Sequence, residues 1–172
     1  MLEKQKWYKN PEMLIALTAL FIGLITAFIS IYSAYIDRAY AKASVWPKVE
    51  VFRSKGKDRF SYGVANRGTG PAIIKYVKVS IGKRYLQQWS DLPEFNSIYQ
   101  SHISSTTLPA GEMIKPLVYK GEAVENILKI DKRLEIELCY CSIYDDCWVV
   151  SRSLQARPVE QCEVNSKQAF LQ

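Results

Sequence analysis

The sequence lacks the groupings of side chains on which most enzymes depend. It contains a single histidine, His102, so a nucleophile–histidine–carboxylate triad has only one possible base. The acidic pair Asp145-Asp146 falls between two apolar stretches, where aspartate is expected in a turn because its side chain hydrogen-bonds the local backbone. We therefore predict that the protein is not an enzyme, with no catalytic residue, no metal site and no cofactor.

Long runs of like charge are also missing. The chain has 23 Lys and Arg residues and 17 Asp and Glu residues, a net charge of +6, and both kinds are scattered along it. Nucleic-acid binding usually concentrates basic residues in a patch or an arm, so no nucleic-acid partner is expected. A moderate basic excess suits a protein that lies beside anionic lipid headgroups.

The glycine-rich stretch 66–71, NRGTGP, lacks the features of a phosphate-binding loop. Such loops lead into a helix and usually end in a Lys-Ser or Lys-Thr pair, whereas here a β-branched stretch follows and the pair is absent. Two glycines and a proline between apolar segments instead predict a sharp connection between strands.

Residues 13–36 form one uncharged, mostly apolar run between Glu12 and Asp37. At about 1.5 Å per helical residue, this run is long enough to cross a bilayer core of roughly 30 Å. A cleaved signal peptide is the alternative, because lysines precede the run and Ala41-Lys42-Ala43 has the form of a cleavage site. The run is longer than the usual apolar region of a signal peptide, roughly 7–15 residues, so we favour an uncleaved, single-pass anchor in the cell (inner) membrane.

Small residues recur along one face of this predicted helix, at spacings of three or four. They are Ala19, Gly23, Ala27, Ser30 and Ala34. Within lipid, close approach over small residues drives helix association, so we expect this face to pack against a second copy or a membrane protein partner. Small residues are also common in membrane spans, and on that alternative the pattern has no function.

The remainder of the chain is predicted to be mainly β. Apolar residues alternate with polar ones in 48–53, 60–65 and 134–140, as in half-buried strands. Pro116 confines 113–120 to an edge strand or a bulge, and 121–130 predicts one or two helical turns. We divide the chain into a tail (1–12), a transmembrane helix (13–36), a linker (37–45), a β domain (46–155) and a C-terminal tail (156–172). This last tail looks weakly ordered, although Val159 and Phe170 could dock on the domain.

Three short motifs resemble a known domain family. They are VANRGTGPA at 64–72, VKV at 77–79 and LPAGE at 108–112. Together they resemble immunoglobulin-like β-sandwich domains of the CARDB type from bacterial adhesion modules. With Trp46-Pro47 and Tyr140-Cys141-Ser142, the chain is similar to uncharacterised bacterial single-pass membrane proteins. The resemblance covers roughly 46–155; it implies an immunoglobulin-like sandwich, to which the sequence adds one or two short helices, and it implies no catalytic residue.

The segment between Arg84 and Thr107 departs from a simple sandwich. It predicts a short helix that starts near Ser90, and it is rich in aromatic residues. Because loops on a rigid scaffold often carry recognition, we take four of its residues as a candidate partner-binding surface. They are Trp89, Phe95, Tyr99 and His102. The alternative is that the aromatic side chains cap one end of the sandwich.

The four cysteines lie near the end of the chain. Cys139 and Cys141 fall on the face of their predicted strand that carries glutamates, and a turn brings Cys147 close to Cys141. A Cys141–Cys147 disulfide in an oxidising compartment is one interpretation. A second interpretation is that the cysteines are reduced and chemically unreactive in a cytoplasmic domain. A third is a metal site built from Cys139, Cys141, Cys147 and Cys162, against which the Cys-x-Cys spacing argues.

Function can be predicted from these features only as a class. The basic residues on the two sides of the apolar run nearly balance, so the orientation rests on the disulfide, which favours an extracytoplasmic domain. We expect a membrane-anchored binding or assembly protein whose partners are the bilayer and another membrane chain, or a second copy. The alternative is a ligand-sensing membrane module of a defence or signalling system.

Overall fold

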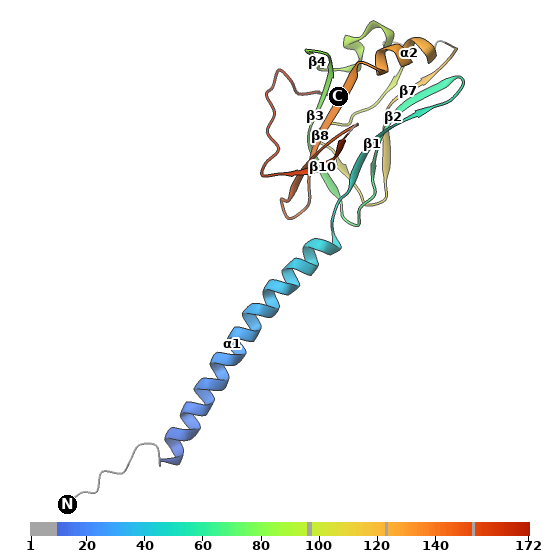
Figure 1. Ribbon diagram of the computed structural model, residues 1–172. Coiled ribbons are helices and arrows are strands. Elements are labelled where there is room, and N and C mark those ends of the chain that lie inside the picture. The colour runs from blue at the N-terminus through green and yellow to red at the C-terminus, as the bar shows by residue number, and fades with distance from the viewer. Residues whose placement is uncertain (1–9, 96–97, 123, 153) are drawn as a thin grey trace, which may run out of the picture. The chain divides into compact units, whose positions relative to one another are not determined.

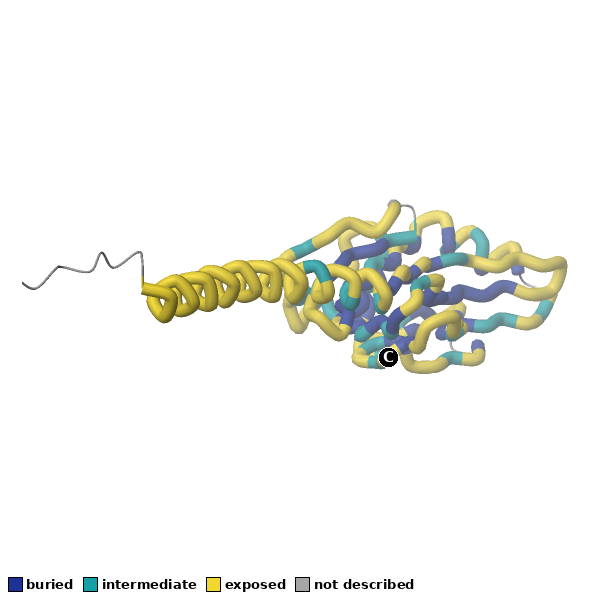
Figure 2. Tube along the Cα trace, turned by 90° about the horizontal axis from the view of Figure 1, so that it is seen from below, coloured by how far each residue is buried: buried dark blue, intermediate teal, exposed yellow. Residues whose placement is uncertain are grey.

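The computed structural model describes residues 10–95, 98–122, 124–152 and 154–172, and separates into two compact units, 1–43 and 44–172. The first unit consists of the helix α1 (Pro11–Ser44), which is long and apolar enough to cross a membrane, as a signal sequence can also be. Figure 2 shows that most of it is exposed and that none of it is buried. The helix continues through the predicted linker 37–45 as far as Ser44, and Pro47 prevents it from going further.

The second unit contains two antiparallel sheets (Figure 1). One sheet has the order β1-β2-β7-β5, with β1 (Val49–Lys55), β2 (Arg59–Asn66), β7 (Met113–Lys120) and β5 (Tyr99–Gln100). The other has the order β10-β9-β8-β3-β4, with β10 (Leu154–Val159), β9 (Cys147–Ser151), β8 (Leu134–Cys141), β3 (Ala72–Ile81) and β4 (Arg84–Leu86), and with β6 (Thr107–Leu108) also on β3. The prediction of a mainly β chain after an N-terminal helix is confirmed.

Both sheets contribute to one core. Val51, Tyr62 and Leu117 of the first sheet are buried in the same cluster as Val79 and Leu138 of the second. Alternation along 134–140 correctly predicted the core face of β8. It was wrong for β2, which is buried on both faces. The reason is that the Phe52 ring packs where a side chain at Gly63 would lie.

The glycine-rich stretch is a tight connection between β2 and β3, as predicted. Asn66 is fully buried, and its side-chain amide donates to the backbone oxygens of Gly70 (2.8 Å) and Leu108 (3.0 Å). Its side-chain oxygen accepts from the backbone N–H of Lys48 at 3.1 Å. An added Cβ at Gly68 would lie 2.1 Å from the Trp46 carbonyl oxygen, so the loop can hold the start of the domain only because glycine occupies this position.

Short elements complete the domain. Pro116 lies at a bulge, since the β2–β7 register shifts between Tyr62 and Val64, and the helix α2 (Val124–Asp131) occupies the predicted helical segment. In place of one short helix near Ser90, two single 3₁₀ turns form, η2 (Trp89–Asp91) and η3 (Pro93–Phe95).

The C-terminal segment is part of the fold, which corrects the predicted boundary at 155 and the weak order of 156–172, and agrees with the alternative that Val159 and Phe170 dock. β10 extends to Val159, and the following residues cross the outer face of the second sheet, where Val159, Cys162 and Val164 pack on Tyr76 and Val149. The chain then turns so that Phe170 enters the main core, 1% exposed. In Figure 1 this segment is the red-brown trace after β10.

Candidate binding groove

A groove of about 620 Å³ runs along one side of the domain between β1 and the strands β9 and β10. The free edge of β1 forms one wall, because among the described residues this strand pairs with β2 alone. The lining residues are Trp46, Lys48, Val49, Glu50, Val51, Phe52, Tyr140, Trp148, Val150, Ser151, Arg152, Gln155 and Ala156. Its volume falls within the range of small-molecule and short-peptide sites.

Three aromatic rings form a continuous series in this groove. The Trp46 and Trp148 ring centroids are 5.0 Å apart, and those of Trp148 and Tyr140 are 5.7 Å apart with the rings nearly parallel. Exposure rises along the series, from 1% at Tyr140 through 8% at Trp148 to 52% at Trp46. The groove therefore offers an exposed indole whose position is fixed by a buried neighbour, as in many binding surfaces.

Tyr140 joins the two sheets beneath this aromatic series. Burial raises the pKa of the Tyr140 hydroxyl, while a hydrogen bond with the backbone of Val49 on β1 opposes that rise. The hydroxyl thus stays neutral across the physiological range. It holds β1 beside β8 and β9 without forming a strand ladder, which leaves the edge of β1 beside an open groove.

The buried carboxylate of Asp131 lies beyond the far end of the groove. It has no exposed surface and forms ion pairs with Arg53 of β1 and with Arg152, which follows β9. The Tyr62 hydroxyl donates to it at 2.8 Å, and the Arg152 guanidinium also donates to the Asp131 carbonyl oxygen at 3.0 Å. Burial and the Asp131 charge raise the pKa of Tyr62, so this hydroxyl remains a donor. The network ties both walls of the groove to the end of α2.

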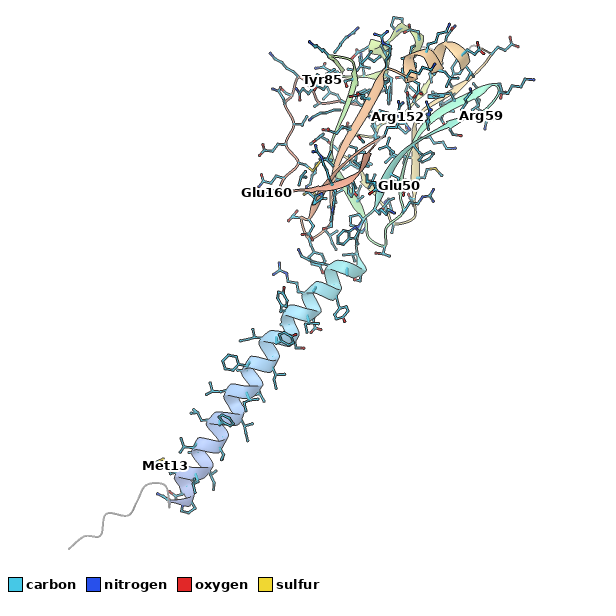
Figure 3. The ribbon with its side chains drawn as sticks, in the orientation of Figure 1. Met13, Glu50, Arg59, Tyr85, Arg152 and Glu160 are labelled. Carbon is cyan, nitrogen blue, oxygen red and sulfur yellow. A yellow bond between two sulfur atoms is a disulfide. The ribbon has the colours of Figure 1, made fainter. Side chains whose placement is uncertain are left out.

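Charge in this region is positive on balance. Two guanidinium groups, Arg53 and Arg152, share one buried carboxylate, which leaves one positive charge in excess. Glu50 is offset by Lys48 at 3.7 Å and Arg67 at 3.8 Å. Figure 3 labels Glu50 and Arg152, two of the charged residues that line the groove. An anionic group would therefore meet a favourable field beside Arg152 and Arg53.

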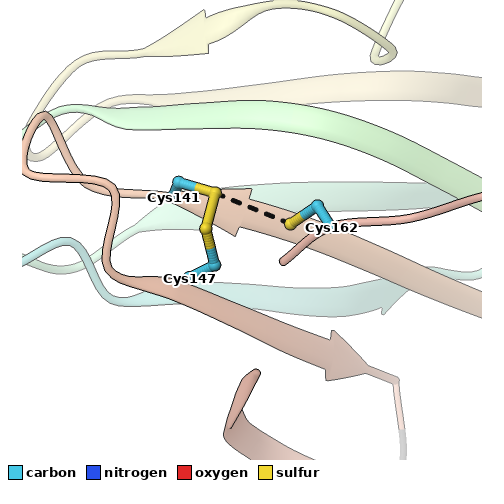
Figure 4. Close-up of side chains that lie close together, drawn as sticks. All are labelled: Cys141, Cys147 and Cys162. Atoms are coloured by element: carbon cyan, nitrogen blue, oxygen red, sulfur yellow. Dashed lines mark hydrogen bonds between the residues drawn. A yellow bond between two sulfur atoms is a disulfide. The ribbon is translucent and has the colours of Figure 1, made fainter. Parts of the chain in front are cut away.

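The cysteines form two disulfides on the outer face of the second sheet. Cys141 is bonded to Cys147 across the β8–β9 hairpin, and Cys139 is bonded to Cys162 in the C-terminal segment. The sulfur atoms of Cys141 and Cys162 are 3.6 Å apart, as Figure 4 shows. Cys139 and Cys141 share a face with Glu137, as predicted, but the C-terminal segment covers that face, and both cysteines are at most 2% exposed.

The disulfides bear on the metal alternative. The sulfur atoms of Cys141, Cys147 and Cys162 all lie within 4.8 Å of one another. All four cysteines are bonded in pairs, however, and a metal ion binds the thiolate form of cysteine. The oxidised domain therefore offers no thiolate here.

Two of the four predicted partner-binding residues are inside the domain. Trp89 is 1% exposed and Phe95 is fully buried, and both belong to the main core with their rings 6.0 Å apart. They cap one end of the core, which is the alternative considered for this segment. Tyr99, 86% exposed, and His102 remain at the surface, and Tyr99 lines a hollow of about 550 Å³ on the β5 edge with Lys115 and Lys120.

The small-residue face of α1 is exposed throughout, including Ala19, Gly23, Ala27, Ser30 and Ala34. Its hydroxyl group is satisfied within the helix, because Ser30 donates to the Thr26 carbonyl oxygen at 2.8 Å. An added Cβ at Gly23 would meet nothing within 4 Å, so nothing in this chain requires glycine there.

Sequence reasoning missed the groove and the Asp131 network. Tyr140 and Trp148 are opposite each other across the β8–β9 hairpin, but Trp46 comes from a distant part of the chain, and nothing in the sequence predicts that it meets them. One signal was available: an aspartate, Asp131, follows the apolar positions of the predicted helix 121–130. A charge on the buried face of a helix is rarely left without a partner.

Comparison with protein-family models, with curated proteins and with solved structures finds no match to this chain.

Proposed function

We propose that this chain is a single-pass, membrane-anchored binding or assembly protein, and that the groove along β1 is its binding site. One observation carries the proposal: the groove begins at Trp46, two residues after the end of α1. Two extended residues span at most about 7 Å, so the chain itself keeps the first groove residue near the end of the helix. A partner in the same membrane would have its juxtamembrane segment within reach of this groove.

The placement of the domain belongs to the same proposal. Two disulfides support an extracytoplasmic domain on the outer side of the cell (inner) membrane, because disulfides persist in oxidising compartments. Two packed antiparallel sheets are compatible with an immunoglobulin-like sandwich and with the bacterial membrane-protein family that the sequence resembles. Thiol labelling of intact cells should then show four protected cysteines that react only after reduction. Four thiols that react on lysis without reductant would contradict the extracytoplasmic placement.

The membrane helix contributes a second contact in this proposal. The exposed small-residue face around Gly23 would pack on another helix, of a second copy or of the partner. Replacing Gly23 by leucine fills that face without a clash inside the chain. We expect G23L to weaken association in membranes. Association is measured by fluorescence energy transfer between copies whose α1 is labelled without using cysteine, and the control replaces Ile22 by leucine. Unchanged association would remove the helix from the proposal.

Site-specific photo-crosslinking in native membranes tests the groove. A photoreactive phenylalanine derivative replaces Gln155, an exposed residue of the groove, and in separate chains Tyr99 on the β5 edge and Lys83 in the β3–β4 turn. We expect a discrete crosslinked membrane protein from position 155 and none from position 83. Crosslinks from position 99 alone would move the binding surface to the β5 edge and overturn the proposal for the groove.

Ligand sensing is the second candidate, because the groove volume of about 620 Å³ lies within the range of small-molecule sites. On this alternative the crosslink from position 155 is to a small molecule, and mass spectrometry of the purified chain shows an added mass of that size. Protein-sized adducts would support the assembly function.

A further inference from the structure

We infer that the occupant of the groove is an extended peptide segment that pairs with the free edge of β1 and carries an acidic side chain to Arg53 and Arg152. This inference rests on the proposed binding function and specifies the partner. Two independent features of the groove carry it, the direction of the β1 backbone groups and the excess positive charge.

The register of β1 shows which backbone groups face the groove. The Arg67 N–H donates to the Lys48 carbonyl oxygen at 2.7 Å, one step beyond the pair Val49–Asn66. In an antiparallel ladder, hydrogen-bonded pairs alternate along a strand, so even-numbered residues of β1 bond to β2 and odd-numbered ones turn the other way. Val51 and Arg53 therefore direct their N–H and C=O groups toward the groove side.

This backbone edge suits a peptide strand. Adding a strand to a sheet edge is a common mode of peptide recognition, in which main-chain hydrogen bonds provide affinity and alternate side chains enter pockets. At about 3.3 Å per residue, the edge from Val49 to Arg53 is about 13 Å long and matches four or five peptide residues; the Val49 backbone already bonds to Tyr140, so Val51 and Arg53 are the residues left to pair. Trp46 and Trp148 lie at the Val49 end, where they would contact an apolar or aromatic side chain.

The charges select an acidic segment. Arg53 is about half exposed, and its guanidinium has five donors, of which one nitrogen contacts Asp131. Arg152 lines the groove and is anchored to the same carboxylate, so two fixed cations flank this end of the groove. Fixed guanidinium groups bind carboxylates by charge-assisted, often bidentate, hydrogen bonds. A basic segment would instead face like charge.

The test uses probe peptides with the full-length protein in detergent micelles. Each probe is a fluorescently labelled peptide of six residues that contains one tyrosine, one aspartate and otherwise β-branched residues. Across the series, the tyrosine and the aspartate occupy every position in turn. Matched peptides carry asparagine or lysine in place of aspartate. A second series carries an N-methyl group at each position in turn, which removes one backbone donor. Binding is measured by fluorescence anisotropy.

We expect the tightest aspartate peptide to bind about tenfold more strongly than its asparagine match, and the lysine match to bind more weakly still. R53Q should abolish the preference for aspartate, while K83Q, far along the sequence in the β3–β4 turn, should keep it. N-methylation should weaken binding at every second position, because only alternate peptide residues face β1.

Three results would overturn the inference. They are equal binding of the three matched peptides, N-methyl effects that do not alternate, and no binding of any peptide up to millimolar concentration. The peptide comparison needs no protein variant, so a folding defect in R53Q cannot hide the answer. If the peptides fail this test but position 155 still gives specific photo-crosslinks, the proposed function stands. Only an acidic strand is then excluded as the occupant of the groove.

Discussion

Two strands of the domain, β3 and β1, differ in whether the rest of the chain covers their outer edge. On β3, the side away from β8 is paired with β6 at one end and β4 at the other, and the chain's own C-terminal residues fill the interval, with the Phe170 N–H donating to the Val77 carbonyl oxygen at 2.8 Å. On β1, no described strand takes that place, and a groove follows the edge. Unprotected strand edges invite pairing with other chains.

The comparison shows that this fold can close an edge with its own chain. The residues that do so are held by several contacts: the Leu171 N–H donates to Gln87, and the Gln172 side chain accepts from the Trp89 N–H at 3.0 Å and donates to Gln100 at 2.9 Å. By contrast, no described strand pairs with the outer edge of β1, and the exposed Trp46 lies just before this strand. The open edge is thus the more suitable place for a partner.

Removing the Phe170 side chain should open the edge of β3 that the C-terminal residues close. We expect this change to cause the largest loss of stability. F170A leaves a cavity in the main core, and we expect a loss of about 4 kcal/mol in the free energy of unfolding. The measurement is urea unfolding of the full-length protein in detergent, followed by tryptophan fluorescence. L171A is the matched control, because Leu171 is 66% exposed, and it should change stability by less than about 0.5 kcal/mol. Similar values for both would show that the segment does not contribute to the core.

Removing the Cys139–Cys162 disulfide should loosen the segment that leads to the closed edge. The bond closes a loop with a sequence separation of 23, against 6 for Cys141–Cys147. We expect a loss of about 3 kcal/mol for the double variant C139S/C162S and about 2 kcal/mol for C141S/C147S, since a longer loop loses more chain entropy. The same unfolding assay compares the two. The reverse order would contradict this account of the C-terminal segment.

Breaking the Asp131 network should loosen the two walls of the groove beside β1 and destabilise the domain. D131N keeps the shape of the side chain but removes the charge that holds Arg53 and Arg152, and we expect a loss of about 2 kcal/mol. This is below the usual loss for a fully buried pair, because both arginines are partly exposed. Asp58, an exposed residue of the β1–β2 turn, provides the control D58N. A neutral D131N would mean that the arginines position the groove without contributing to stability.

The smallest effect on stability is expected in the groove itself. W46A removes a half-exposed ring, so the free energy of unfolding should fall by less than about 1 kcal/mol. Crosslinking from position 155 should nevertheless be lost, because the ring is an exposed anchor of the groove. Stability unchanged and crosslinking retained would separate Trp46 from the binding site.

The sequence predicted those parts of the fold that depend on local pattern. Alternation located the core face of β8, Pro116 marked a bulge, and the apolar spacing of 124–128 indicated α2. Each of these depends on residues a few positions apart, where sidedness and backbone chemistry decide the outcome.

The remaining parts depend on long-range pairing. The Arg53–Asp131 contact joins residues 78 positions apart, and Phe170 enters the core only because β3 has an interval of unpaired edge. Trp89 and Phe95 show the same limit: an aromatic insertion is compatible with either an exposed surface or a cap on the core, and only the position of neighbouring strands distinguishes the two. The groove could not be predicted from the sequence for the same reason, because the order of strands in the sheets decides which edges are free.

The place of Phe170 in the core has a consequence for biosynthesis. Ribosomes make a chain from its N-terminus, so the edge of β3 is completed only by a residue about 90 positions later in the chain. Until Phe170 arrives, the nascent domain exposes an incomplete core and an unfilled strand edge, both prone to aggregation. The core and this strand edge can therefore be completed only after Phe170 has been synthesised.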